Sequence, residues 1–264
     1  MVFEKKKILV VVKTYPNPSK KYQETVCVAG VLLDDPPSWI RLYPVPFRNL
    51  PQIQQFKKYT IIEAEISKNP QDVRPESYKI NAESIQTIQT IGTENNWRRR
   101  KELLLPMVDP SMCQIQADRD ITGKSLGLFK PSKIEDLIIE PTEKRDWDDS
   151  EKQILSQMNL FDPSQKALEK IPYKFKIHYF CSDAKCSGHT QGLIDWETGE
   201  LYRKVIKNCD EPTALEKIRN KYLSEIFNPN RDPYLIVGNQ FGGPLSFLIL
   251  SVFWPFEDGQ LSLF

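Results

Sequence analysis

Short apolar segments separated by polar turns dominate the first 90 residues. A β-branched run covers 8–13, and further apolar stretches follow at 24–33, 39–45 and 60–67. Proline, aspartate and serine fill the gaps, so the pattern predicts short strands roughly ten to fifteen residues apart. Many short strands with almost no helix are typical of a small barrel or sandwich.

The pattern changes near Trp97. NNWRRRKELLLP at 95–106 is the first stretch with helical character. Strand-like patterning returns after residue 125, and the second half adds one helical stretch at 213–227 among five strands. A helix inserted among five strands fits an oligonucleotide/oligosaccharide-binding (OB) barrel. We therefore predict a mainly β chain with a few helices, a β-rich α+β class, built from two OB-like small barrels.

This reading divides the chain into four parts. A chain of 264 residues is long enough for two small domains. The second barrel carries a polar insertion at about 142–170. The predicted parts are an N-terminal barrel, a basic helix with its linker, the second barrel and a short tail, at 1–94, 95–124, 125–256 and 257–264.

Composition narrows the function classes. Lysine and arginine number 36 and aspartate and glutamate 35, for a net charge of +1, so a nucleic-acid site must be a local patch rather than a polycationic surface. No apolar run reaches the roughly 18 residues of a membrane span, which predicts no membrane partner. Five cysteines, an odd number without a secretion signal, favour a cytoplasmic protein without a disulfide framework.

Several segments spread over most of the chain are distinctive. They include KTYPNPSKKYQETVCVAGV, WIRLYPVPFRNL, CSDAKCSGH, LIDWETGELYR and the late VGNQ and SFLIL. Together they resemble a group of poorly characterised prokaryotic proteins with a dual OB-type domain. The resemblance implies two barrels of a nucleic-acid-binding type. It brings no established activity and no site residues.

The last five residues, QLSLF at 260–264, form the sharpest motif. They resemble the short peptide with which bacterial polymerases and repair proteins bind the DNA sliding clamp. Leu263 and Phe264 are adjacent large apolar side chains that a partner's pocket would bury, and Gln260 can hydrogen-bond at its rim. The alternative is a final strand that tucks Leu261, Leu263 and Phe264 into the core.

A looser copy of this motif lies inside the polar insertion. QMNLF supplies Gln157, Leu160 and Phe161 in the corresponding places. The alternative is an amphipathic helix that docks on the body through Ile154, Leu155 and other apolar residues at helical spacing.

Both histidines and three cysteines fall within 178–209. Zinc takes four thiolate or imidazole ligands, usually from two close-spaced pairs. The most economical set is Cys181, Cys186, His189 and Cys209. His178 is a spare candidate, because on a strand it would face away from Cys181.

Zinc is thus the predicted cofactor, in a structural role. The alternative is a set of ordinary thiols in a reducing compartment. The remaining cysteines, Cys27 and Cys113, are expected to be core or surface residues.

Acidic residues after the cluster offer a catalytic alternative. His189, Asp195 and Glu197 could hold a divalent metal for phosphodiester hydrolysis, with the two carboxylates on one face of a strand. The competing interpretation is a hairpin with a solvated acidic face. The sequence holds no phosphate-binding glycine loop, no Gly-x-Ser-x-Gly and no dinucleotide fingerprint.

Aromatic and basic residues interleave at two places, as single-strand-binding surfaces do. The alternatives are solvated charged faces and core aromatics. The candidates are one strand with its exit and the basic helix start: Trp39, Arg41, Tyr43 and Arg48, then Trp97, Arg98, Arg99, Arg100 and Lys101.

We expect a nucleic-acid-binding adaptor without catalysis, recruited to the sliding clamp and acting in replication, repair or defence against mobile DNA. Its partners would be the clamp and nucleic acid, expected to be single-stranded. A metal-dependent nuclease and a non-catalytic scaffold subunit are the two alternatives. DNA versus RNA and the oligomeric state stay open.

Overall fold

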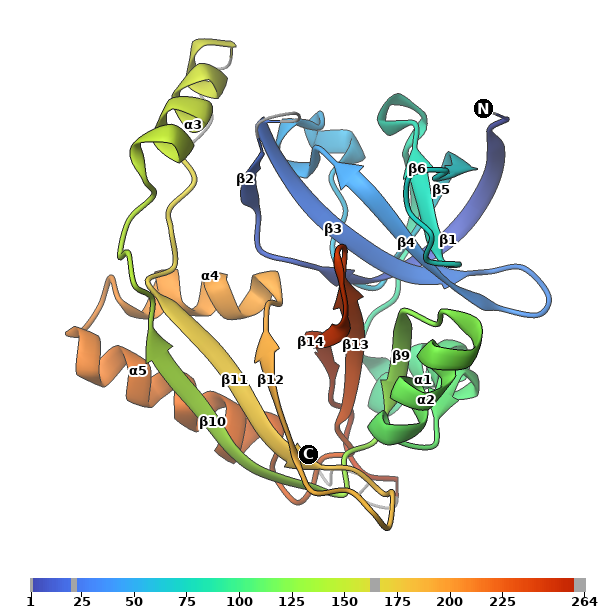
Figure 1. Cartoon of the computed structure of the whole chain (residues 1–264), viewed down its shortest axis with the longest axis vertical. Coiled ribbons are helices and arrows are strands. Elements are labelled where there is room, and N and C mark those ends of the chain that lie inside the picture. The colour runs from blue at the N-terminus through green and yellow to red at the C-terminus, as the bar shows by residue number, and fades with distance from the viewer. Residues whose placement is uncertain (1, 20–22, 162–166, 259–264) are drawn as a thin grey trace.

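The computed structural model describes residues 2–19, 23–161 and 167–258, with the backbone alone described at 23 and 157–161. Two seven-stranded sheets make up most of the molecule and pack against each other (Figure 1). In the described part of the chain, no helix is both long and apolar enough to cross a membrane.

The first sheet closes on itself. β1 pairs with β3 on one side and with β5 on the other, so Leu9 lies opposite both Val31 and Ile61. All barrel pairings are antiparallel except β4 with β6. In order around the barrel the strands are β1 (Glu4–Lys13), β3 (Gln23–Leu32), β4 (Ser38–Val45), β6 (Ser77–Ile80) and β5 (Thr60–Lys68), with β2 (Asn17–Ser19) on β3 and β7 (Gln86–Thr90) on β5. The closed five-stranded barrel confirms the OB-like prediction.

The apolar run of β1 explains its central place. Ile8 and Val10 point into the barrel interior, whereas Leu9 and Val11 face the second sheet. A strand buried on both faces shows a continuous apolar run instead of alternation. The second core layer joins the two sheets, because it also holds Ile236 of the second sheet.

The second sheet is an open path in the described part of the chain. Its order is β10 (Lys133–Pro141), β11 (Tyr173–Phe180), β12 (His189–Leu193), β14 (Gly243–Phe253), β13 (Tyr234–Gln240), β9 (Leu126–Phe129) and β8 (Val108–Asp109). The mainly β class is therefore confirmed. The region predicted as a second barrel, 125–256, differs from a closed barrel in that β10 and β8 remain edges.

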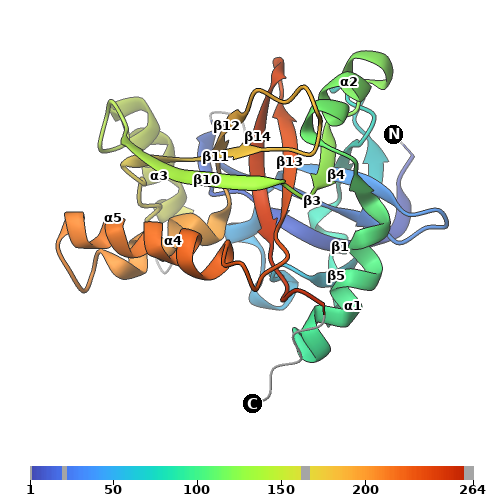
Figure 2. The same ribbon diagram turned by 90° about the horizontal axis from the view of Figure 1, so that it is seen from below.

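In the described part of the chain, five α-helices lie around the sheets. Figure 2 shows α4 and α5 on one flank, α1 on the other, and β13 and β14 between them. The polar insertion contains α3, which contacts β2 and β3. The helices are α1 (Glu94–Leu104), α2 (Met112–Thr122), α3 (Asp149–Phe161), α4 (Trp196–Val205) and α5 (Glu211–Asn220), which continues as a π-helix (Lys221–Ile226). Short 3-10 turns occupy Phe47–Asn49, Gln52–Gln54, Ala82–Ser84 and Leu105–Met107.

Candidate metal centre and nucleic-acid groove

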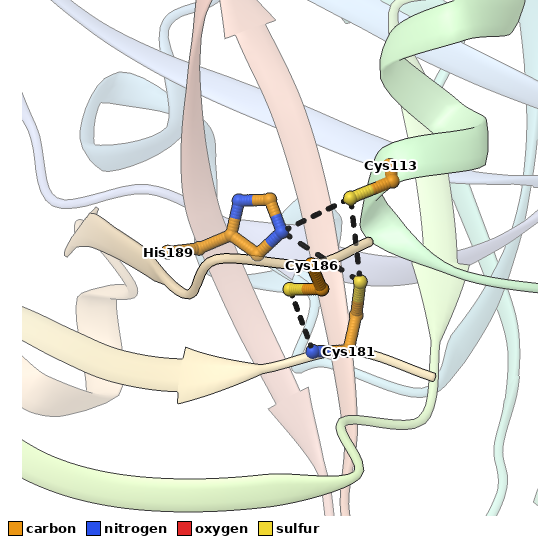
Figure 3. A group of neighbouring side chains, drawn as sticks. All are labelled: Cys113, Cys181, Cys186 and His189. Atoms are coloured by element: carbon orange, nitrogen blue, oxygen red, sulfur yellow. Dashed lines mark hydrogen bonds between the residues drawn. The ribbon is translucent and has the colours of Figure 1, made fainter. Parts of the chain in front are cut away.

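Three thiols and one imidazole converge beside the start of α2. The ligand atoms of Cys113, Cys181, Cys186 and His189 all lie within 4.8 Å of one another. The Cys113 and Cys181 sulfurs are 3.6 Å apart, and His189 Nε2 is 3.6 Å from each of them (Figure 3). Ligands around a tetrahedral zinc are about 3.6–3.8 Å apart, given bonds of about 2.0–2.3 Å. The four residues therefore have the geometry to hold a metal ion.

Local backbone structure aims these side chains at one point. Ser111 caps α2 by accepting a hydrogen bond from the Gln114 N–H, which places Cys113 in the first turn. Cys181 follows β11, and His189 begins β12. The Cys186 sulfur accepts hydrogen bonds from the N–H groups of Cys181 and Gly188, both at 3.4 Å.

The cluster also favours a thiolate. Burial acts to raise the pKa of Cys181, but backbone hydrogen bonds at Asp183 and Cys113, together with the His189 ring, lower it to about 6. Burial and the hydrogen bond with Cys181 raise the pKa of Cys113 to about 12. The pKa values of the two thiols thus shift in opposite directions. This is expected for adjacent thiols, because the charge on one sulfur opposes ionisation of the other unless a cation is bound.

The predicted ligand set needs one correction. Cys181, Cys186 and His189 come together as predicted, but the fourth member of the cluster is Cys113 rather than Cys209. The Cys209 thiol donates instead to the Val205 carbonyl, at the end of α4. Sequence spacing missed Cys113 because it lies 68 residues before Cys181, and only the pairing of α2 with the sheet brings it in.

A second feature is a groove of about 450 Å³ between the barrel and the β13–β14 hairpin. Its floor is the outer face of β3 and β4, and its sides are the segment after β1, the β5–β6 loop and the hairpin. These are the OB surfaces that bind oligonucleotides and oligosaccharides. Residues lining it include Asn17, Thr25, Arg41, Tyr43, Arg74, Asn239 and Phe241, and no described residue of its lining is acidic.

Arg41 lies at the bottom of this groove without a counter-ion. It is 3% exposed and forms no ion pair within the described chain. One terminal nitrogen donates to the Ser125 carbonyl at 3.1 Å and lies 3.5 Å from the Ser125 hydroxyl, which donates in turn to the Glu76 carboxylate. The other donates to the Cys27 sulfur at 3.5 Å, while the buried Nε has no hydrogen-bond partner among the described residues. Buried charges are normally paired, so the arrangement can accept an anion.

Aromatic rings stand at the groove's rim on both sides. Tyr43 on β4 is 39% exposed and Phe241 at the hairpin tip is 72% exposed. Arg74 links the walls: it pairs with Asp72 at 2.6 Å, donates to the Asn239 carbonyl at 2.8 Å and lies over the Phe241 ring. Burial acts to raise the pKa of Asp72, but hydrogen bonds from Arg74 and Ser77 lower it to about 2.

The other strand residues predicted for nucleic acid have structural partners. Trp39 is buried in the core between the two sheets. Arg48 forms an ion pair with the buried Glu24 at 2.7 Å. Of the four residues predicted on this strand and its exit, Arg41 and Tyr43 line the groove.

The basic start of α1 divides in a similar way. Arg98 and Arg99 are exposed and share Glu102, at 3.1 and 2.9 Å. Exposed pairs of this kind contribute little to stability and remain accessible.

The next two basic residues are buried. The Arg100 guanidinium lies 3.8 Å from the centroid of the Tyr59 ring and 4.8 Å from that of Trp97. Lys101 pairs with Asp258 at 2.5 Å. The Trp97–Lys101 run therefore does not form one continuous basic surface.

The residues of the catalytic alternative are separated. His189 lies in the thiol cluster, whereas Asp195 follows the far end of β12, roughly 20 Å of strand away at about 3.3 Å per residue. Asp195 caps α4, so Glu197 is on a helix and not on the expected hairpin. Both carboxylates pair with the buried Lys58, at 2.8 and 2.7 Å.

The clamp-like motifs lie mainly beyond what the structure describes. Gln260, Leu261, Leu263 and Phe264 are outside the described residues. Gln157, Leu160 and Phe161 belong to α3, where the backbone alone is described. Neither use of these motifs is tested by the structure.

Family models cover both halves of the chain. A domain of unknown function (DUF8758) matches residues 4–106. A second one (DUF8757) matches residues 108–264, more than half of the chain. The chain belongs to the DUF8757 family. This assignment brings no activity, because the function of neither domain is known.

Individual proteins add little to this. No curated protein matches the sequence. Among solved structures, the chain is similar to a murine DNA-binding protein bound to double-stranded DNA, at 10% identity over 96% of each chain and a TM-score of 0.30. A likeness this slight carries no argument.

Proposed function

We propose that this DUF8757-family protein binds single-stranded nucleic acid in the groove between the barrel and the β13–β14 hairpin. The observation that carries the proposal is Arg41, a buried guanidinium that forms no ion pair with a described carboxylate, in a groove whose described lining holds no acidic residue. A phosphate in the groove would supply a counter-ion through a charge-assisted contact with the guanidinium.

The rim residues support a single strand over a duplex. Bases of a single strand can splay out and stack on exposed rings, and Tyr43 and Phe241 offer one ring from each wall. A duplex keeps its bases stacked inside, out of reach of such rings. A volume of about 450 Å³ admits a nucleotide or two, not a double helix.

We also propose that the Cys113–Cys181–Cys186–His189 cluster binds structural zinc. Three thiolates and one imidazole are a common zinc set, and four protein ligands leave no open position for catalysis. Bound metal would fasten α2 to the 181–189 loop, and α2 precedes β9, the strand next to the hairpin strand β13. Bound metal would thus stabilise the part of the second sheet that carries the β13–β14 hairpin.

The test is fluorescence anisotropy with an oligothymidylate of about 15 nucleotides and with a duplex of the same length. Wild type should prefer the single strand, and Tyr43→Ala should weaken binding about 5- to 100-fold, since one stacked base is worth about 1–3 kcal/mol. Tyr43→Phe keeps the ring and is the matched control, with affinity close to wild type. Equal binding by Tyr43→Ala and Tyr43→Phe would contradict the groove.

Recruitment to a sliding clamp is a further proposal that rests on the QLSLF sequence at 260–264. The chain is fastened to α1 up to Asp258, where Asn96 and Lys101 hold Phe256 and Asp258. The motif begins two residues beyond this anchor.

Calorimetric titration of a purified bacterial clamp tests the recruitment. Binding at about micromolar strength should disappear in Leu263→Ala/Phe264→Ala. Leu160→Ala/Phe161→Ala is the matched control and separates the two motif copies. Unchanged binding in both double variants, or none in wild type, would remove the clamp from the account.

A further inference from the structure

A second cavity lies at the seam of the two sheets, away from the groove. It has a volume of about 700 Å³ and is enclosed by the end of β1, the turn before β5, α1, α4 and the end of β14. In Figure 2, α1 and α4 lie on either side of β14. We call this cavity the junction pocket; its walls include Lys13, Lys57, Tyr59, Trp97, Lys204 and Trp254.

Tyr59 is the least satisfied residue of the junction pocket. It is 5% exposed, and its buried hydroxyl has no hydrogen-bond partner within the described chain. Its backbone is left-handed, with φ of 64°, which is rare for an aromatic residue. Backbone hydrogen bonds with Val10 and Ile91 fix it in this state. An unpartnered buried hydroxyl in the wall of a cavity is an unsatisfied group that calls for an explanation. A ligand that shifts the Tyr59 ring slightly could supply the partner.

Indole rings form much of the remaining wall. The ring centroids of Trp97 and Trp254 are 5.6 Å apart, and the ring planes meet at 64°. Both side chains are half-buried. Trp97 is also left-handed, with φ of 59°, in a run of three such residues that starts at Asn95. Strained backbone of this kind concentrates at binding sites. Faces of partly exposed indoles are stacking surfaces for planar rings.

Lysines supply the charge. Lys57 and Lys204 are exposed and form no ion pair among the described residues. Lys13 is largely buried, with its ammonium 4.0 Å from the centroid of the Phe47 ring and donating to the Phe56 carbonyl. Burial lowers the pKa of Lys13 to about 8, against nearby carboxylates that raise it.

The acidic residues of the wall are already engaged. Glu197 pairs with Lys58, and Glu200 pairs with Arg203 at 2.7 Å. The unpaired charge in the pocket is therefore positive. The pocket therefore favours an anionic ligand.

We infer that the junction pocket binds a nucleoside phosphate, with its base against the indoles and its phosphate among Lys13, Lys57 and Lys204. The volume lies within the range of small-molecule sites, about 300–1,000 Å³. The ligand is a free nucleotide or the phosphorylated terminal nucleotide of a strand, since both present the same chemistry. The inference does not depend on the groove, because the two cavities share no lining residue.

Calorimetry with adenosine 5′-monophosphate, thymidine 5′-monophosphate, adenosine and inorganic phosphate tests this. Either monophosphate should bind more tightly than adenosine or phosphate alone. Lys57→Ala/Lys204→Ala should weaken its binding at least about tenfold, because two charge-assisted contacts are lost. Lys207→Ala is the matched control, an exposed lysine three residues beyond Lys204 and outside the pocket, and should bind like wild type.

Tyr59→Phe separates a ligand role from a structural one. It removes a hydroxyl with no protein partner, so the fold should be at least as stable as wild type. Monophosphate affinity should nevertheless fall about 5- to 10-fold, the effect of one lost hydrogen bond. Unchanged affinity in Tyr59→Phe and in Lys57→Ala/Lys204→Ala would overturn the inference, as would no binding of any phosphorylated probe to wild type.

Two further arms identify the source of the ligand and separate this site from the groove. If strand ends are the ligand, an oligothymidylate with a terminal phosphate should displace the monophosphate. If free nucleotide is the ligand, the oligothymidylate should not displace it. Tyr43→Ala should leave monophosphate binding intact, because Tyr43 lies in the groove. Failure of the groove and failure of the junction pocket are thus distinguishable.

Discussion

The barrel and the second sheet achieve their shapes by different means. The barrel closes through backbone pairing, because β1 joins β3 to β5. The second sheet ends at two edges, β10 and β8, in the described part of the chain. Its neighbouring strands also pair through the backbone, and side chains add two further ties. One is the thiol cluster, and the other is Lys58, which reaches from the barrel to Asp195 and Ser251.

This difference assigns separate tasks to the two regions. The closed barrel presents Arg41 and Tyr43 in the groove. The second sheet adds the hairpin with Phe241, and it carries Cys181, Cys186 and His189 of the thiol cluster. The groove needs both, so perturbing each region should affect binding and stability in different proportions.

Loss of metal should have the largest effect and should fall on the second sheet. Structural zinc contributes about 10–16 kcal/mol to the folding of small finger peptides, and a domain with its own core will show part of that. Cys113→Ser should lose bound zinc and lower the melting temperature, by metal analysis and circular dichroism. Cys209→Ser, the matched control outside the cluster, should keep zinc and stability. A zinc-free wild type, or equal behaviour of the two variants, would contradict the metal centre.

Lys58→Met should have the next largest effect on stability, because it removes the ion pair between the barrel and Asp195 at the start of α4. Lys58 is 7% exposed, and burial raises the pKa of Asp195, so removing the ammonium leaves a buried carboxylate uncompensated. Breaking such a pair from one side costs about 3–5 kcal/mol. Chemical denaturation measures this, with Lys57→Met as the exposed neighbour that should change little.

A second variant makes the Lys58 test sharper. Asp195→Asn keeps an oxygen to cap α4 while removing the charge. If the ion pair itself stabilises the fold, Lys58→Met/Asp195→Asn should lose less free energy of unfolding than the two single variants lose together. Simple additivity would mean that Lys58 acts through packing alone.

Phe241→Ala should have the smallest effect on stability and a clear effect on binding. The ring is 72% exposed, so the free energy of unfolding should change by less than about 0.5 kcal/mol. Single-strand affinity should fall about 5-fold or more through lost stacking. Arg98→Ala/Arg99→Ala, on the face that sequence alone also predicted, should weaken binding less. The reverse order would move the site from the groove to α1.

Local pattern predicted the barrel well and the second sheet less well. The continuous apolar run of β1 and the turns between short strands are visible in the sequence, and they became the closed barrel. Closure of the second sheet could not be foreseen, because it depends on whether β10 meets β8, which strand patterns do not encode. Residues after 195 were expected as a hairpin, yet Asp195 caps a helix there.

Site residues close in sequence were easier to predict than those brought together by the fold. Cys181, Cys186 and His189 share one loop and were assigned from spacing, whereas Cys113 comes from α2. The basic run of α1 shows why the environment of a charge is hard to predict. Arg100 lies over the Tyr59 ring and Lys101 pairs with Asp258, whereas Arg41 forms no ion pair with a described carboxylate. The availability of a charge depends on its partners, and those are set by tertiary structure.

Hydrogen exchange with and without a saturating oligothymidylate tests the central claim most directly, because it reports both walls of the groove in one experiment. The account predicts that bound strand slows exchange together in β3–β4, in the β5–β6 loop around Arg74 and at the tip of the β13–β14 hairpin. Protection confined to α1, or present on one wall and absent from the other, would contradict binding between the barrel and the second sheet.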